Sequence, residues 1–188
     1  MNLFRTTPRL LLKRPTYHRT LFSLPSFPPS GAQTYHEQKI FPYKRSELYA
    51  IVSDVSSYPQ FIPYCTGSRI LHKATHEGSV IMDAELTVGF MAFQERYVSK
   101  VTCTPFSSVE AVASSSTPMF KSLKTIWRFQ PAGEKEHPDH TLVSLDLAFD
   151  FVNPLYASLS SAFFDKVSGG MVTAFEKRCD EVCGRGRV

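Results

Sequence analysis

Between residues 67 and 152, apolar and polar side chains alternate along the chain, and no helical segment interrupts them. A period of two is the pattern of strands that bury one face. Parallel strands need long crossover connections, which this region lacks, so an antiparallel meander is predicted. The expected strands, divided by turn-like spots rich in Gly, Pro and Ser, are residues 68–74, 79–88, 92–104, 108–114, 123–129 and 141–151.

A single long amphipathic helix is predicted after these strands, over residues 153–183. Asn153 is a suitable cap, and Pro154 takes the first helical position, where its missing N–H costs nothing. The helix is either an ordinary core helix or the cover of a cavity. Gly169 and Gly170 mark a bend or a close approach to another backbone. Apolar residues recur at every fourth position and form one stripe: Leu155, Leu159, Phe163, Val167, Met171 and Phe175.

The first 36 residues differ in composition from the rest. They contain five Arg or Lys residues, many Ser, Thr and Pro, and no acidic residue. This pattern is typical of a mitochondrial presequence followed by a linker, and a disordered basic tail is the alternative. The expected domain is 37–183, with a five-residue tail at 184–188. The domain is nearly neutral, which argues against a nucleic-acid partner.

Ahead of the strands, a short extended segment is expected at 37–43 and a short helix at 46–55. Pro59 and Pro63 exclude a regular helix or central strand in the loop that follows. The predicted fold is therefore α+β: a curved antiparallel sheet of about seven strands wrapped around the long C-terminal helix. A curved sheet under one helix often leaves room for an apolar ligand.

Several segments resemble the Coq10 coenzyme Q-binding proteins. Residues 52–65 (VSDVSSYPQFIPYC) are similar to the segment after their first helix, and 120–129 (FKSLKTIWRF) to their strand carrying Trp-Arg-Phe. Residues 149–155, 163–167 and 171–179 resemble their last strand and helix. The resemblance extends over about 37–183 and includes several separate segments in the same order, which makes it specific.

This resemblance implies a helix-grip, START-like domain of the polyketide-cyclase superfamily. It also implies binding of ubiquinone or its biosynthetic intermediates, with no other cofactor. The implied role is that of a lipid chaperone for respiratory electron transport and coenzyme Q synthesis. The implied location is the matrix side of the mitochondrial inner membrane, as a peripheral protein, with synthesis or respiratory complexes as further partners.

The predicted lining of the quinone cavity combines the inner face of the strands with the helix stripe. Trp127, the only tryptophan, either lines the cavity or fills the core. Glu95 and Tyr97 face inward if Gln94 and Arg96 face water, and a carboxyl there needs a partner or solvent. Glu95 and Thr125, with Tyr97, are the candidate head-group contacts. The lining is predicted to be Phe61, Phe93, Tyr97, Trp127, Phe149, Leu159, Phe163, Val167 and Met171.

Two loops carry apolar tips that could gather at one end of the fold. An isoprenoid quinone travels poorly through water, so its carrier must contact a membrane. The tips either dock on the membrane or close the pocket. The candidate contacts are Ile62, Tyr64, Met119 and Phe120.

No catalytic constellation is found in the sequence. The histidine pairs at His72 and His76 and at His137 and His140 flank turns. Cys179 and Cys183 are helix neighbours without a second ligand pair, so no metal site is predicted. Two other functions on the same architecture stay open: a polyketide cyclase-like enzyme, and a ribosome or protein interaction module.

Overall fold

The computed structural model describes residues 33–90, 93–114, 120–132, 139–152 and 154–184. Within these ranges, the side chains of Phe90, Phe93, Phe120, Phe151 and residues 154–166 lie outside the description. The elements are β1 (Gln33–Phe41), α1 (Arg45–Ser53), a 3₁₀ helix η1 (Val55–Gln60), β2 (Cys65–His76), β3 (Ser79–Phe90), β4 (Phe93–Thr104), β5 (Ser108–Ala113), β6 (Phe120–Pro131), β7 (Thr141–Phe151) and α2 (Pro154–Cys183).

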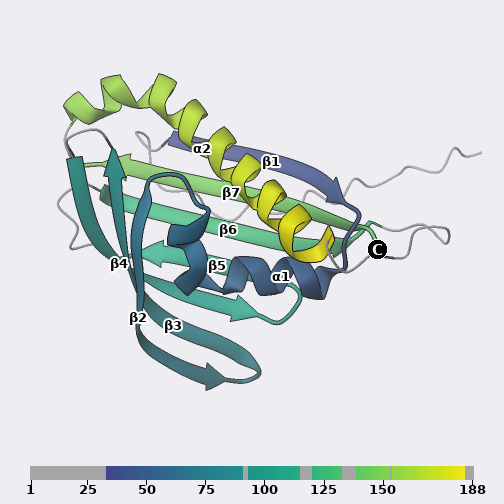
Figure 1. The fold of residues 1–188 in the computed structure, drawn as a ribbon. Helices are drawn as coiled ribbons and strands as arrows, with labels where there is room; N and C mark the ends of the chain where they lie inside the picture. The colour runs from purple at the N-terminus through teal and green to yellow at the C-terminus, as the bar shows by residue number, and fades with distance from the viewer. Residues whose placement is uncertain (1–32, 91–92, 115–119, 133–138, 153, 185–188) are drawn as a thin grey trace, which may run out of the picture.

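All seven strands form one sheet in the order β1-β7-β6-β5-β4-β3-β2, and every neighbouring pair is antiparallel. The predicted meander and the single long helix are therefore confirmed. Figure 1 shows α2 running diagonally across the concave side of the curved sheet, with α1 beside its C-terminal end. Each strand and helix contributes an apolar surface to the layer between them.

The alternation in the sequence separates the two faces of the sheet. The register pairs Met82 with Val101 and Trp127 with Leu145, and all four side chains are buried on the concave face. Ile126 departs from the pattern, because it is only 4% exposed although it lies on the convex face. Its register neighbours on that face are Glu110 and Asp146.

The domain begins earlier than the sequence predicted. Residues 33–36, which the sequence analysis placed in the linker, belong to β1 and pair with β7. Tyr35 packs against buried apolar residues, and His36 Nδ1 lies 2.6 Å from Asp146 Oδ1. These contacts explain why strand pairing extends into residues 33–36. Residues 1–32 of the predicted presequence lie outside the description.

The connection between α1 and β2 follows the sequence prediction that its prolines exclude a regular helix. Instead, η1 includes Pro59, and residues 61–64 form an irregular turn. The Tyr58 hydroxyl donates to the Val52 carbonyl at 2.6 Å, and Gly89 N–H donates to the Tyr64 carbonyl at 2.8 Å. The loop is therefore tied to α1 at one end and to the end of β3 at the other.

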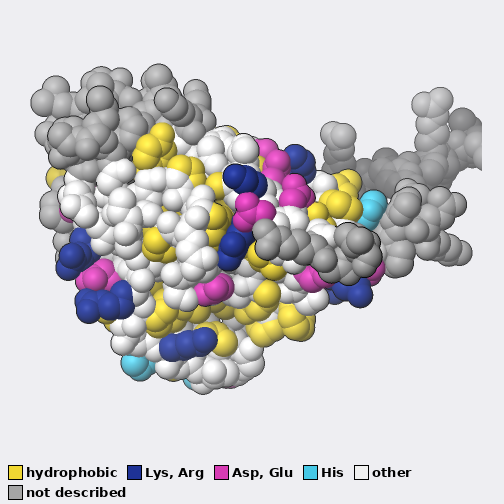
Figure 2. Space-filling model, in the orientation of Figure 1, with side chains coloured by type: hydrophobic (Ala, Val, Ile, Leu, Met, Phe, Trp, Pro, Cys, Tyr) yellow, Lys and Arg dark blue, Asp and Glu magenta, His cyan; other side chains and the backbone are white. Residues whose placement is uncertain are grey.

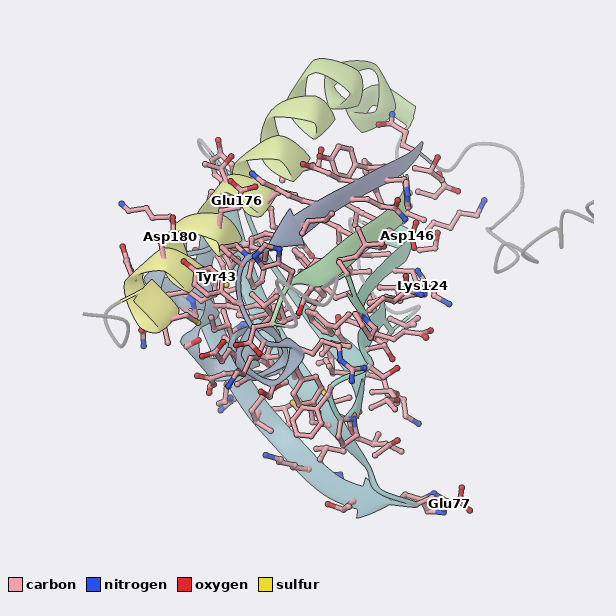
Figure 3. All side chains as sticks on the ribbon, turned by 90° about the vertical axis from the view of Figure 1, so that its right-hand side faces the viewer. Tyr43, Glu77, Lys124, Asp146, Glu176 and Asp180 are labelled. Carbon is pink, nitrogen blue, oxygen red and sulfur yellow. The ribbon has the colours of Figure 1, made fainter. Side chains whose placement is uncertain are left out.

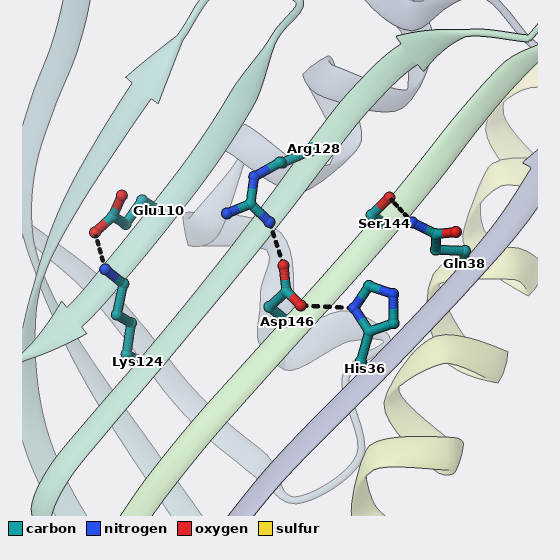
Figure 4. Close-up of polar contacts among 7 residues, drawn as sticks. All are labelled: His36, Gln38, Glu110, Lys124, Arg128, Ser144 and Asp146. Carbon is teal, nitrogen blue, oxygen red and sulfur yellow. Dashed lines mark hydrogen bonds and ion pairs between the residues drawn. The ribbon is translucent and has the colours of Figure 1, made fainter. Parts of the chain in front are cut away.

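Polar side chains on the convex face pair across the strands (Figure 4). Asp146 on β7 accepts from His36 on β1 and from Arg128 on β6. Lys124 and Glu110 lie 2.8 Å apart. Arg96 Nε on β4 lies 4.0 Å from Glu85 Oε1 on β3. Each pair has a partly exposed partner and contributes little stability individually. The charged side chains thus lie on the convex face, and the concave face carries mainly apolar side chains.

Candidate functional site

The C-terminal half of α2 closes tightly over the concave face. Phe175 is 3% exposed, and its ring centroid lies 4.5 Å from that of Trp127, 5.2 Å from Phe61 and 5.7 Å from Tyr58. Aromatic rings at these separations make favourable edge and tilted contacts. We call this part of the concave face the closed half; its strand residues are Val101, Cys103, Val109, Trp127, Phe129, Val143 and Leu145.

Polar contacts fix the same half of α2 to β1 and to its extension. Lys39 Nζ lies 2.6 Å from Glu176, and the Tyr43 hydroxyl donates to Asp180 at 2.7 Å. Figure 3 shows Tyr43, Glu176 and Asp180 grouped along this seam. The hydrogen bond to Asp180, followed by burial, raises the pKa of Tyr43 to about 12. The phenol therefore remains a neutral donor at physiological pH.

Arg178 attaches the loop before β2 to the outer side of α2. Its guanidinium donates to Gln60 at 3.2 Å and lies 5.4 Å from the centre of the Phe61 ring. A cation over an aromatic face adds an electrostatic attraction to the packing. Phe61 is thus held between Arg178 and Phe175, which makes it part of the closed half.

Packing loosens along the strands toward the other end of the sheet. On β6, Trp127 and Phe129 are buried, whereas Leu123 and Thr125 on the same face are half-buried. On strands β3, β4 and β5, the inward-facing side chains also become more exposed toward this end of the sheet. We call this region the open half of the concave face; it consists of Leu86, Val88, Glu95, Tyr97, Ala111, Ala113, Leu123 and Thr125, all half-buried. These mainly apolar side chains retain accessible surface, which is what a bound apolar molecule would cover.

A second apolar cluster lies beside the open half. Leu147 and Phe149 of β7 are 7% and 6% exposed, and Tyr35, Leu123 and Met171 pack against them. The cluster joins β1, β6, β7 and α2 at the point where α2 leaves the closed half. It therefore forms a side wall of the open half.

Tyr97, Glu95 and Thr125 are the predicted polar contacts, and the structure places all three in the open half. Burial, and then the nearby Cys65 thiol, raises the pKa of Tyr97 above its ordinary value. Tyr97 is consequently a neutral phenol that can donate a hydrogen bond. Gln94 and Arg96, its neighbours on the opposite face, are exposed, as the alternation predicted.

The predicted lining residues fall into separate groups. Phe61 and Trp127 belong to the closed half, where they serve as core, and Tyr97 belongs to the open half. Phe149 and Met171 meet in the side wall, and Val167 on α2 is half-buried. The side chains of Phe93, Leu159 and Phe163 lie outside the described ones.

The strand ends next to the two predicted loop tips lie at one end of the sheet. Cys65 pairs with Val88 near the end of β3, and Phe120 pairs with Phe151 at the matching ends of β6 and β7. Ile62 and Tyr64 are half-buried, and Ile62 packs against the core. The other two predicted contacts lie outside the described side chains: those of Met119 and Phe120.

Sequence reasoning missed three parts of the wall. Tyr35 and Glu37 face α2 from β1, and Leu147 contributes to the side wall. Glu37 and Lys39 interrupt the apolar alternation on this face of β1, and Tyr35 lies beyond the boundary assigned to the presequence and linker, so the local pattern gave no clear signal. Leu147 lay on the predicted inner face, although it was not singled out.

No group of three or more metal-ligating side chains occurs among the described residues. All four thiols are buried, and burial, followed by the neighbouring Cys183, raises the pKa of Cys179 to about 12. His72 and His76 are exposed, and His137 lies outside the description. Within the described part of the chain, no helix is long and apolar enough to cross a membrane. Figure 2 shows charged side chains of both signs interspersed on the face that carries α2.

A curved antiparallel sheet gripping one long helix defines the START-like class, and comparisons agree. The family described as "Polyketide cyclase / dehydrase and lipid transport" matches residues 41–176. An aromatase/cyclase from Streptomyces sp. R1128 superposes with a TM-score of 0.66 over 79% of this chain and 94% of its own, at 13% identity, which shows the fold alone. An 18 kDa protein of Caulobacter crescentus has a TM-score of 0.66 at 29% identity, over 81% of this chain and 99% of its own.

Proteins similar in sequence indicate which family within this class the chain belongs to. The coenzyme Q-binding protein COQ10 of Dictyostelium discoideum is 32% identical over 84% of this chain and 74% of its own. The COQ10 homolog B of Xenopus laevis is 38% identical over 82% of this chain, although the match spans only 61% of the frog protein. A ribosome association toxin, RatA, of Pseudomonas aeruginosa is 31% identical over 77% of this chain and 94% of its own. The chain belongs to the Coq10 family of the polyketide cyclase and lipid-transport superfamily.

Proposed function

We propose that this protein binds ubiquinone, or an isoprenoid intermediate of its synthesis, over the open half of the concave face. The observation that carries the proposal is the change from buried to half-buried side chains along one apolar face. Relatives named as coenzyme Q-binding proteins support the ligand class. The closed half keeps the helix on the sheet, while the open half offers apolar surface to the ligand.

The proposed role is that of a non-catalytic lipid chaperone that supports respiration and coenzyme Q synthesis. A quinone with an isoprenoid tail is too apolar to cross water unaided, so a carrier shields it between membrane sites. The same relatives are named mitochondrial, and the basic, acid-free N-terminus fits a presequence. We place the protein on the matrix side of the inner membrane, with residues 61–64 and 119–120 toward the lipid.

Co-purified lipid tests this function. The full chain is produced in a quinone-making host, purified without detergent and extracted, and the lipid is identified by mass spectrometry. Near-stoichiometric ubiquinone is expected. Leu123→Lys places a charge in the open half and should abolish co-purification, whereas Val112→Lys, at an exposed position on the convex face, should not. A folded wild-type chain that is empty and takes up no quinone from liposomes would contradict the proposal.

A ribosome-associated function is the second candidate. It is favoured by the match to RatA, which extends over 94% of that protein. Co-sedimentation with mitochondrial ribosomes at physiological salt checks this candidate directly. Binding that persists in the Leu123→Lys variant would show an interaction surface separate from the open half.

A further inference from the structure

Tyr35 and Glu37 place a polar pair beside the open half. Both belong to the face of β1 that α2 covers, since Lys39 on the same face reaches Glu176 of α2 at 2.6 Å. The Tyr35 hydroxyl donates to the Glu37 carboxylate, and both side chains are half-buried. The pair therefore keeps accessible surface on the face of β1 that α2 covers.

Apolar side chains lie beside Tyr35. Tyr35 packs against Leu147 and Phe149, and Met171 packs on the same two residues from α2. Glu37 pairs in register with Leu145 of the closed half, and its carboxylate accepts from Tyr35, which packs in the side wall, so it lies at the border between the closed half and the side wall. A head group that reaches this border has apolar contacts on its faces and the carboxylate at its edge.

An ionised carboxylate only accepts hydrogen bonds, and it can accept about four. Tyr35 supplies one donor. The neighbouring ammonium of Lys39 is hydrogen-bonded to Glu176, and this bond is the main reason that its pKa is raised. With respect to these described donors, Glu37 retains capacity for a further donor from a ligand.

Quinone carbonyls are acceptors, whereas the two hydroxyls of a hydroquinone are donors. We propose that Glu37, positioned by Tyr35, makes this site selective for the reduced, hydroquinone form of its ligand. This proposal rests on the proposed quinone-binding function and refines it. A hydrogen bond to a charged acceptor contributes on the order of tenfold or more in affinity.

Calorimetric titration of the full chain with decylubiquinone and, anaerobically, decylubiquinol tests the selectivity. The wild type should bind the hydroquinone about tenfold more tightly than the quinone. Glu37→Gln should remove most of this ratio by weakening hydroquinone binding, because an amide oxygen is a weaker, uncharged acceptor. Glu110→Gln removes an equal charge from the convex face and should leave the ratio unchanged. Circular dichroism confirms the fold of each variant.

Tyr35→Phe separates the roles of the two residues. Because the Tyr35 hydroxyl positions the Glu37 carboxylate, Tyr35→Phe should lower the preference for hydroquinone, but by less than Glu37→Gln does. Equal wild-type affinities, or a ratio that Glu37→Gln leaves intact, would overturn the selectivity but leave quinone binding in place. Failure of the folded wild type to bind either form would overturn both proposals. Should Glu37→Gln fail to fold, Glu37→Asp should lower the ratio by shortening the reach of the carboxylate.

Discussion

The closed and open halves of the concave face share strands β4, β5 and β6 and differ in how fully their side chains are packed. Leu145 in the closed half is 2% exposed, whereas Leu123, on the adjacent strand β6, is half-buried. Three rings fill the closed half: Phe175 from α2, Tyr58 from η1 and Phe61, the residue after η1. The difference teaches that one amphipathic face can supply both a folding core and a binding surface, provided that the helix is fixed at one end.

Phe175→Ala should produce the largest loss of stability. Its ring touches Trp127, Phe61 and Tyr58, so truncation leaves a cavity at the centre of the closed half. A cost of about 3–5 kcal/mol is expected for a large aromatic in a core. Urea unfolding measures it, with Val182→Ala, which is 51% exposed on the same helix, as the control within about 0.5 kcal/mol. A loss below about 1 kcal/mol would mean that the closed half is not the core.

The same substitution in the two halves should have different costs. Leu145→Ala removes a fully packed side chain and should cost about 2–5 kcal/mol. Leu123→Ala removes a half-buried one and should cost about 1 kcal/mol in the ligand-free protein, but it should weaken quinone binding. Unfolding of both variants with and without decylubiquinone gives the two quantities. Equal losses of stability would remove the distinction between the halves.

The seam that fixes α2 should weaken at high pH. The folded-state pKa of Tyr43 is about 12, above its ordinary value of 10.0, because the hydrogen bond to the Asp180 carboxylate favours the protonated phenol and burial disfavours the phenolate. The stabilisation is therefore complete below about pH 10, where both states are protonated, and is lost as the pH rises through about 12. Stability of the wild type relative to Tyr43→Phe should decrease over this interval. A difference that stays constant from about pH 8 to 12 would contradict this role for Tyr43.

Gly169→Ala should have the smallest effect, with the opposite sign. A Cβ at Gly169 meets no atom within 4 Å, so the variant should gain up to about 1 kcal/mol of helix propensity. At Gly170 the added Cβ lies 3.7 Å from Pro63, an ordinary contact. Gly67→Ala is the contrasting variant, because its Cβ would lie 3.2 Å from the Thr87 hydroxyl. Thermal unfolding ranks the three; destabilisation by Gly169→Ala would indicate a constraint on α2 beyond these contacts.

The order of the elements was predictable because alternation and the helix stripe are local properties of the sequence. Strand β7 has the predicted bounds, and α2 begins one residue after the predicted start. The start of the domain was wrong, because Tyr35 and His36 owe their place in β1 to β7, more than a hundred residues away. Composition alone assigned them to the presequence and linker, which contain no acidic residue. A long-range register is not visible in a local pattern.

The site was only partly predictable for a related reason. Alternation placed Tyr97, Thr125 and Trp127 on the inner face, but face alone does not show which side chains α2 covers completely. Phe61 and Trp127 became core because Phe175 packs against both. Leu123, two inward-facing positions before Trp127 on β6, stayed accessible. That division depends on where α2 crosses the sheet, which follows from contacts such as those between Lys39 and Glu176.

Methyl NMR on the full chain tests most directly whether the quinone binds over the open half of the concave face. Decylubiquinone is titrated into protein labelled at Leu and Val methyl groups. Shifts should concentrate in the open half, at Leu86, Val88 and Leu123, while Val101, Val109 and Val143 of the closed half should change little. Shifts confined to the closed half, or to exposed positions such as Val112 and Val182, would contradict a quinone site over the open half.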